Sequence, residues 1–91
     1  MNPNTDRLAN GPPMPAEVEA KLAAIVRAAL ELPSEMDVTG AEQAAIGTWD
    51  SLAHVSLMLA LESEFGIPID VADQVRLTSY RAIRDFLAER R

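Results

Sequence analysis

The fold of this chain is decided by residues 50–66, which read DSLAHVSLMLALESEFG. Asp50 is a favoured N-cap residue and Gly66 a favoured residue just after a helix, so the sequence predicts a helix from Ser51 to Phe65. The apolar residues between these two signals recur at helical spacing, which supports the same element.

This central helix has more apolar residues than one buried face requires. The side chains expected to face the core are His54, Leu57, Met58, Leu61 and Phe65. Leu52, Val55 and Leu59 lie outside that group and extend the apolar arc beyond half the circumference. We expect them to be partly exposed and to bind a partner or ligand, the alternative being burial under the preceding loop or the short third helix. A third sector, predicted to meet other proteins, carries Ala53, Ser56, Ala60, Ser63 and Glu64.

Upstream of the central helix the sequence predicts one more helix and a long loop. Apolar residues at spacings of three and four predict a helix over residues 16–32, which Pro33 ends because the residue before a proline avoids helical geometry. Residues 33–50 contain glycines and small or acidic residues, which is typical of a loop. The apolar residues expected to tie this loop to the core are Met36, Val38, Ile46 and Trp49.

Downstream, two further helices complete the predicted fold. Asp70 caps a short helix near residues 71–75, and a last helix starts after Thr78 or Ser79 and ends near Glu89. The predicted fold class is therefore all-α: a small four-helix bundle made of three main helices and one short helix.

The length and composition limit what this chain can be. Its 91 residues suffice for one domain with a modest core. Residues 1–14 show no periodicity and are predicted to be a disordered tail, and residues 15–91 to be the folded domain. The sequence contains no cysteine, so any thiol chemistry would have to come with a cofactor. Because the N-terminus lacks an apolar run that could be a signal or a membrane span, we expect a cytoplasmic protein.

The charge distribution is one-sided. The net charge is −6, and no Lys or Arg occurs between Arg27 and Arg76. Such a field repels nucleic acid and anionic membranes and favours basic protein surfaces. Asp70 and Asp73 read as a helix cap and its partner and not as a calcium loop, so no metal site is predicted.

Ser51 is the candidate functional residue. Its hydroxyl would lie at the positive end of the helix dipole, where free backbone N–H groups stabilise a phosphate ester. The sequence around it is Gly47-Thr48-Trp49-Asp50-Ser51-Leu52, followed by Val55, Leu57, Leu61-Glu62, Glu64-Phe65-Gly66-Ile67 and Leu77-Thr78-Ser79. In this context the chain resembles the acyl carrier protein family over about residues 16–90.

The resemblance implies a bundle of acyl-carrier-protein type and a function. A phosphopantetheinyl transferase would use coenzyme A to attach 4′-phosphopantetheine to Ser51, and the thiol of this arm would carry acyl groups as thioesters. Asp50 would help to position the metal and the serine during loading. Leu52, Val55, Ser56 and Leu59 would bind the partner proteins: the transferase, an acyl-loading enzyme, and a synthase or transferase with a basic docking surface. No residue is expected to be catalytic, so the chain is not expected to be an enzyme, and it is expected to be a monomer.

One departure from the family pattern narrows the expected pathway. Ala53, Ser56 and Ser63 occupy positions that are often acidic in fatty-acid carriers. We therefore expect a free-standing carrier in a specialised pathway, such as polyketide or other natural-product biosynthesis, and not a housekeeping fatty-acid carrier.

Three alternatives remain at this point. An aminoacyl or peptidyl carrier has the same arm, but more often shows glycines where this chain has Trp49-Asp50. An unmodified helical adaptor would use the apolar residues but has no reason to expose Ser51. A serine hydrolase built from Asp50, Ser51 and His54 is disfavoured, because three neighbours on one turn supply neither an oriented base nor an oxyanion hole. We expect His54 to pack between helices and Trp49 to anchor the loop.

Overall fold

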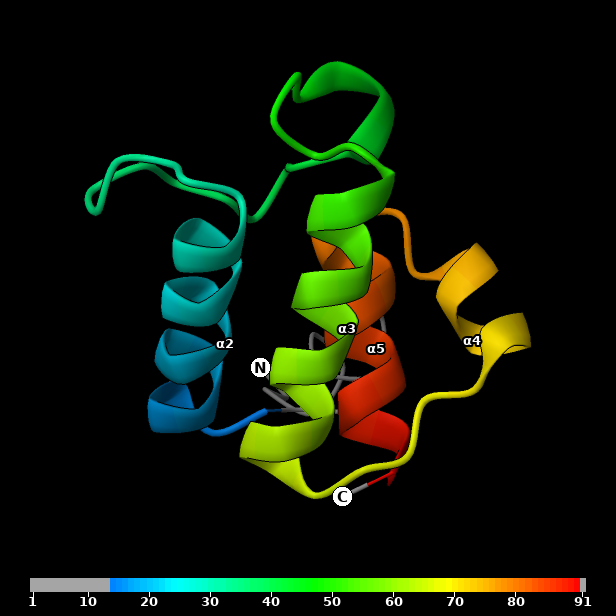
Figure 1. The fold of residues 1–91 in the computed structure, drawn as a ribbon. Coiled ribbons are helices and arrows are strands. Elements are labelled where there is room, and N and C mark those ends of the chain that lie inside the picture. The colour runs from blue at the N-terminus through cyan, green and yellow to red at the C-terminus, as the bar shows by residue number, and fades with distance from the viewer. Residues whose placement is uncertain (1–13, 91) are drawn as a thin grey trace, which may run out of the picture.

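The computed structural model describes residues 14–90, and these residues form a helical bundle (Figure 1). Its elements are α2 (Ala16–Ala29), the short 3₁₀ turn η1 (Gln43–Ala45), α3 (Ser51–Phe65), α4 (Val71–Arg76) and α5 (Tyr80–Arg90). Residues 14–90 contain four α-helices and no strand beyond one isolated bridge between Glu42 and Ser79, so the predicted all-α bundle is confirmed. The predicted tail, residues 1–14, lies outside the described part except for Met14, which packs against the core.

The core lies between the three long helices. Helix α2 packs on α3 and α5, while Figure 1 shows α4 on the side of the bundle away from α2. The buried residues of these three helices are Leu22 and Val26 of α2, Leu57, Met58 and Leu61 of α3, and Tyr80, Ile83, Phe86 and Leu87 of α5. Each fully buried large apolar side chain contributes about 1.5–3 kcal/mol, which makes this cluster the main stabilising term.

Helix α2 ends three residues before the predicted boundary. The predicted end at residue 32 is wrong, because the chain leaves helical geometry at Leu30 and Glu31 adopts a left-handed conformation with φ 57°. The amide of Leu32 donates to Arg27 O over 2.8 Å and that of Glu31 to Ala28 O over 3.3 Å. These two bonds form a Schellman motif, which closes the helix before Pro33 has any effect.

Replacing Glu31 by glycine is expected to stabilise the protein. A left-handed backbone costs a non-glycine residue about 1 kcal/mol, which Glu31→Gly would recover. Glu31 is exposed, so little packing is lost. The melting temperature should rise by about 4 °C or more for a domain of this size, as measured by calorimetry. Gly66→Ala is the matched control: Gly66 has φ 65° with open space around it, so this change should lower the melting temperature.

The long loop is tied to the bundle by fewer side chains than predicted. Val38 and Trp49 are buried and Ile46 is half-buried, as expected. Met36 is 39% exposed, so its predicted anchoring role is wrong. Its backbone makes the contact instead, because Arg27 Nη1 donates to Met36 O over 3.1 Å. Any residue at position 36 would offer the same backbone oxygen, so the side chain of Met36 does not determine this contact.

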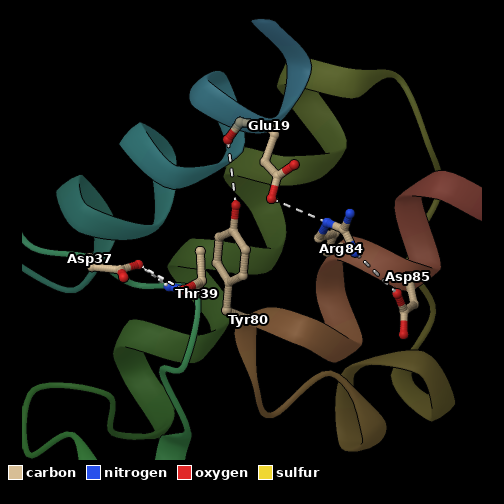
Figure 2. Close-up of polar contacts among 6 residues, drawn as sticks. All are labelled: Glu19, Asp37, Thr39, Tyr80, Arg84 and Asp85. Carbon is tan, nitrogen blue, oxygen red and sulfur yellow. Dashed lines mark hydrogen bonds and ion pairs between the residues drawn. The ribbon is translucent and has the colours of Figure 1, made fainter. Parts of the chain in front are cut away.

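Polar contacts join the start of α5 to α2, and a second set lies within the loop that precedes α3 (Figure 2). The hydroxyl of Tyr80 points to Glu19 O at 3.5 Å, and Arg84 Nε lies 3.2 Å from Glu19 Oε1. Burial raises the pKa of Tyr80, and the neighbouring Glu19 carboxylate adds to this shift. In the loop, the amide and hydroxyl of Thr39 donate to Asp37 and lower the pKa of that carboxyl. The start of α5 is therefore joined to α2, and Thr39 and Asp37 form a turn within the loop.

Candidate functional site

Ser51 is the first residue of α3, and it is exposed. Asp50 precedes it in an extended conformation, and Asp50 Oδ1 accepts a hydrogen bond from the amide of Ala53 over 2.8 Å. The amides of Ser51 and Leu52 come before the first intrahelical bond and so have no acceptor within the helix. The capped first turn thus presents a hydroxyl group beside free N–H donors at the positive end of the helix dipole.

Directly behind this turn, three groups form a chain of hydrogen bonds. Trp49 Nε1 lies 3.0 Å from His54 Nδ1, and His54 Nε2 lies 2.8 Å from Gln74 O. An indole N–H can only donate, so Nδ1 accepts and carries no proton. Nε2 therefore bears a proton and donates a hydrogen bond to the carbonyl of Gln74. His54 packs between elements as predicted, but as a half-buried polar link between α3 and α4.

This chain of hydrogen bonds is incompatible with a serine hydrolase relay. A relay requires one imidazole nitrogen on the serine hydroxyl and the other on a carboxylate. Here the two nitrogens of His54 contact Trp49 and Gln74, while Asp50 caps α3. Asp50, Ser51 and His54 are neighbours without the geometry of a triad.

Five apolar side chains on α3 and α4 are exposed, and we call them together the apolar patch. They are Leu52, Val55 and Leu59 on α3 and Val71 and Val75 on α4. Val55, Val71 and Val75 line the same hollow as Ser51, whereas Leu52 lines a second hollow. Leu52 is 77% exposed and Leu59 is 59% exposed, so the predicted exposure of the three α3 residues is confirmed and their burial under loop or helix is wrong. Ser56, the other predicted partner-binding residue, is exposed on the same helix.

Two open hollows flank the first turns of α3. One, of about 220 Å³, lies between α3 and α4, and its lining includes Ser51, Val55, Val71 and Val75. The other, of about 280 Å³, lies between α3 and the end of α2, and its lining includes Glu31, Asp50 and Leu52. The start of α3 thus separates a mainly apolar hollow from one with two carboxylates on its wall.

Several of the acidic residues between Arg27 and Arg76 have structural partners. Glu62 accepts from the amide of Ile69 over 2.7 Å, Glu64 lies 3.1 Å from Lys21 Nζ, and Asp70 and Asp73 form a capping box on α4. The predicted cap pairing of Asp70 and Asp73 is confirmed. Part of the third sector of α3, which carries Ala53, Ser56, Ala60, Ser63 and Glu64, faces the bundle itself. Glu64 contacts α2, and Ala53 is packed against the core.

Sequence reasoning missed the contribution of α4 to this site. Val71 and Val75 are four residues apart on a short polar helix, a spacing that places them on one face and could have identified them. No sequence signal identifies the carbonyl of Gln74 as the partner of His54, because every residue has such a carbonyl.

Among the described residues, 14–90, no three His, Cys, Asp or Glu side chains are grouped closely enough to hold a metal ion. None of the helices in that range is long and apolar enough to cross a membrane. No family model matches the chain, and no curated protein or solved structure is significantly similar to it.

Proposed function

We propose that this chain is an acyl carrier protein whose 4′-phosphopantetheine arm is attached to Ser51. The observation that carries the proposal is the exposed hydroxyl of Ser51 on the capped first turn of α3, next to the exposed apolar patch. A residue that must accept a bulky group from an enzyme has to be accessible, and the group then needs a surface through which partners recognise its carrier.

The first turn of α3 fits a phosphodiester. In loading, the hydroxyl of Ser51 loses its proton and its oxygen bonds to the phosphorus of the phosphopantetheine group of coenzyme A. The pyrophosphate bond breaks, and adenosine 3′,5′-bisphosphate leaves with the bridging oxygen. The free amides of Ser51 and Leu52 and the helix dipole stabilise the negative charge that remains. Once attached, the phosphopantetheine group supplies a thiol that carries acyl groups. The chain has no thiol of its own, because it contains no cysteine.

The surface around Ser51 has both exposed apolar side chains and negative charge, so it would suit a partner whose surface combines basic and apolar residues. Leu52 and Leu59 provide exposed area, while Glu31 and Asp50 provide negative charge on the adjoining hollow. Acidic surfaces of this kind speed association with basic ones. The proposed partners are a phosphopantetheinyl transferase, an acyl-loading enzyme and a synthase or transferase of a specialised acyl pathway.

Intact mass tests this proposal against the adaptor alternative. The purified protein is incubated with coenzyme A, magnesium and a broad-specificity phosphopantetheinyl transferase. A mass gain of one phosphopantetheine is expected. A folded and unmodified chain that gains nothing would favour the helical adaptor, which uses the same apolar patch without an arm. An aminoacyl or peptidyl carrier gains the same mass and is distinguished by the enzyme that acylates the thiol.

Asp50 has two proposed roles that substitution can separate. Asp50→Ala removes the hydrogen bond to the amide of Ala53 and should lower the free energy of unfolding by about 1 kcal/mol. Asp50→Asn keeps a good N-cap, so its stability should stay close to that of the wild type, while its loading rate falls because the negative charge is lost. Denaturant unfolding and the initial rate of mass gain measure the two effects. If Asp50→Asn and the wild type are loaded at the same rate, Asp50 caps the helix and has no role in loading.

A further inference from the structure

Helix α4 is attached to the bundle in an unusual way. The structure describes all of α4, and none of its apolar side chains is in the core: Val71 is 75% exposed and Val75 is 72% exposed. Its buried residue is Asp73, which serves the capping box of α4 itself. The residues just outside the helix, Ile69 and Leu77, are buried. Apolar packing therefore holds the residues that flank α4, whereas the apolar side chains of α4 itself do not pack against the core.

The middle of α4 is held by the chain of hydrogen bonds through His54. Nε2 of His54 donates to the carbonyl of Gln74, and Nδ1 is fixed by the indole of Trp49, which is 2% exposed. Each partner determines which nitrogen of His54 bears the proton and how the ring is oriented. The three groups form a latch, and we use this word for Trp49, His54 and the carbonyl of Gln74.

The latch lies between Ser51 and the core. His54 and Gln74 line the same hollow as Ser51, and Trp49 behind His54 belongs to the core cluster. Of the residues that line this hollow, His54 is hydrogen-bonded to the buried Trp49, so a group that moved inward past His54 would displace the indole. The exposed Val55, Val71 and Val75 line the part of the hollow that is open to solvent.

We propose that the latch of Trp49, His54 and the Gln74 carbonyl clamps α4 onto α3, so that an acyl group carried through Ser51 stays on the protein surface and does not enter the core. This inference rests on the proposed carrier function. It also defines the substrate class. A long alkyl chain kept outside the core exposes to water the apolar surface that the hollow of about 220 Å³ does not cover, whereas a short or polar acyl group does not. A short or polar cargo is therefore favoured.

Hydrogen exchange on the unloaded protein tests the clamp. His54→Ala removes both hydrogen bonds, and the amides of Gln74 and Leu77, which bond within α4, should then exchange about tenfold faster relative to amides of α2. Gln74→Ala is the matched control, because it leaves the carbonyl acceptor in place and should preserve wild-type exchange at Leu77. If His54→Ala does not fold, His54→Leu removes the same bonds with a smaller loss of volume. Unchanged exchange in α4 would contradict the clamp.

Thermal melting of loaded protein tests where the acyl group lies. Acetyl and octanoyl forms of the wild type should melt within about 1 °C of each other, whereas burial of the octanoyl chain would raise the melting temperature by more than about 10 °C. In His54→Ala the octanoyl form should melt at least about 4 °C above the acetyl form, since the route inward is open.

The outcomes separate this inference from the function on which it rests. Intact mass is measured first, and a chain that takes up no phosphopantetheine contradicts the carrier function and the inference together. A loaded wild type whose octanoyl form melts much higher than its acetyl form contradicts the inference alone. If His54→Ala shows no dependence on chain length, the latch is not what excludes the acyl group.

Discussion

Ser51→Ala is expected to abolish loading with phosphopantetheine completely and to leave the fold intact. The hydroxyl of Ser51 is exposed, and the cap of α3 is supplied by Asp50 and not by Ser51. Removing a surface hydroxyl should therefore change the free energy of unfolding by less than about 0.5 kcal/mol. Intact mass after incubation with the transferase measures loading, and circular dichroism measures helicity.

Ser63→Ala is the matched control for this experiment. Ser63 is also an exposed serine of α3, but it lies about three helical turns beyond the free amides of the first turn. Its substitution should leave the full mass gain in place. Loading that survives in Ser51→Ala, or that disappears in Ser63→Ala, would place the modified serine elsewhere. A loss of helicity in Ser51→Ala would show that the hydroxyl is structural.

Leu57→Ala is expected to have the largest effect on stability among the substitutions considered. The side chain of Leu57 is fully buried between the long helices, and truncating such a leucine costs about 2–5 kcal/mol because a cavity remains. That loss is a large fraction of the total stability of a small domain. Urea unfolding monitored by circular dichroism should give a much lower midpoint with an unchanged slope.

Leu59→Ala is the control for Leu57→Ala on the same helix. Its side chain is 59% exposed, so the same truncation should cost at most about 0.5 kcal/mol. Its effect should appear instead as a lower rate of acyl transfer to a partner enzyme, since Leu59 belongs to the apolar patch. Comparable losses of stability in the two variants would contradict the separation of α3 into a core face and an exposed face.

The sequence alone predicted the elements that local signals define. Asp50 and Gly66 mark the two ends of α3, and the structure has the helix over the predicted residues because capping and left-handed termination need only neighbouring residues. The placement of Ser51 on an exposed first turn follows from the same signals. The exposure of Leu52, Val55 and Leu59 was predictable as well, since one helix cannot bury so wide an apolar arc in a chain of this length.

The folded structure decided the features that no side-chain signal in the sequence marks. Helix α2 ends early in a Schellman motif made by backbone groups, with Glu31 in a conformation that a glutamate disfavours, and Met36 anchors the loop through its carbonyl group. The pairing of His54 with the carbonyl of Gln74 joins residues 20 positions apart, and the side chain of Gln74 takes no part in it. Backbone acceptors are the same at every residue, so only the folded chain determines which one a side chain reaches.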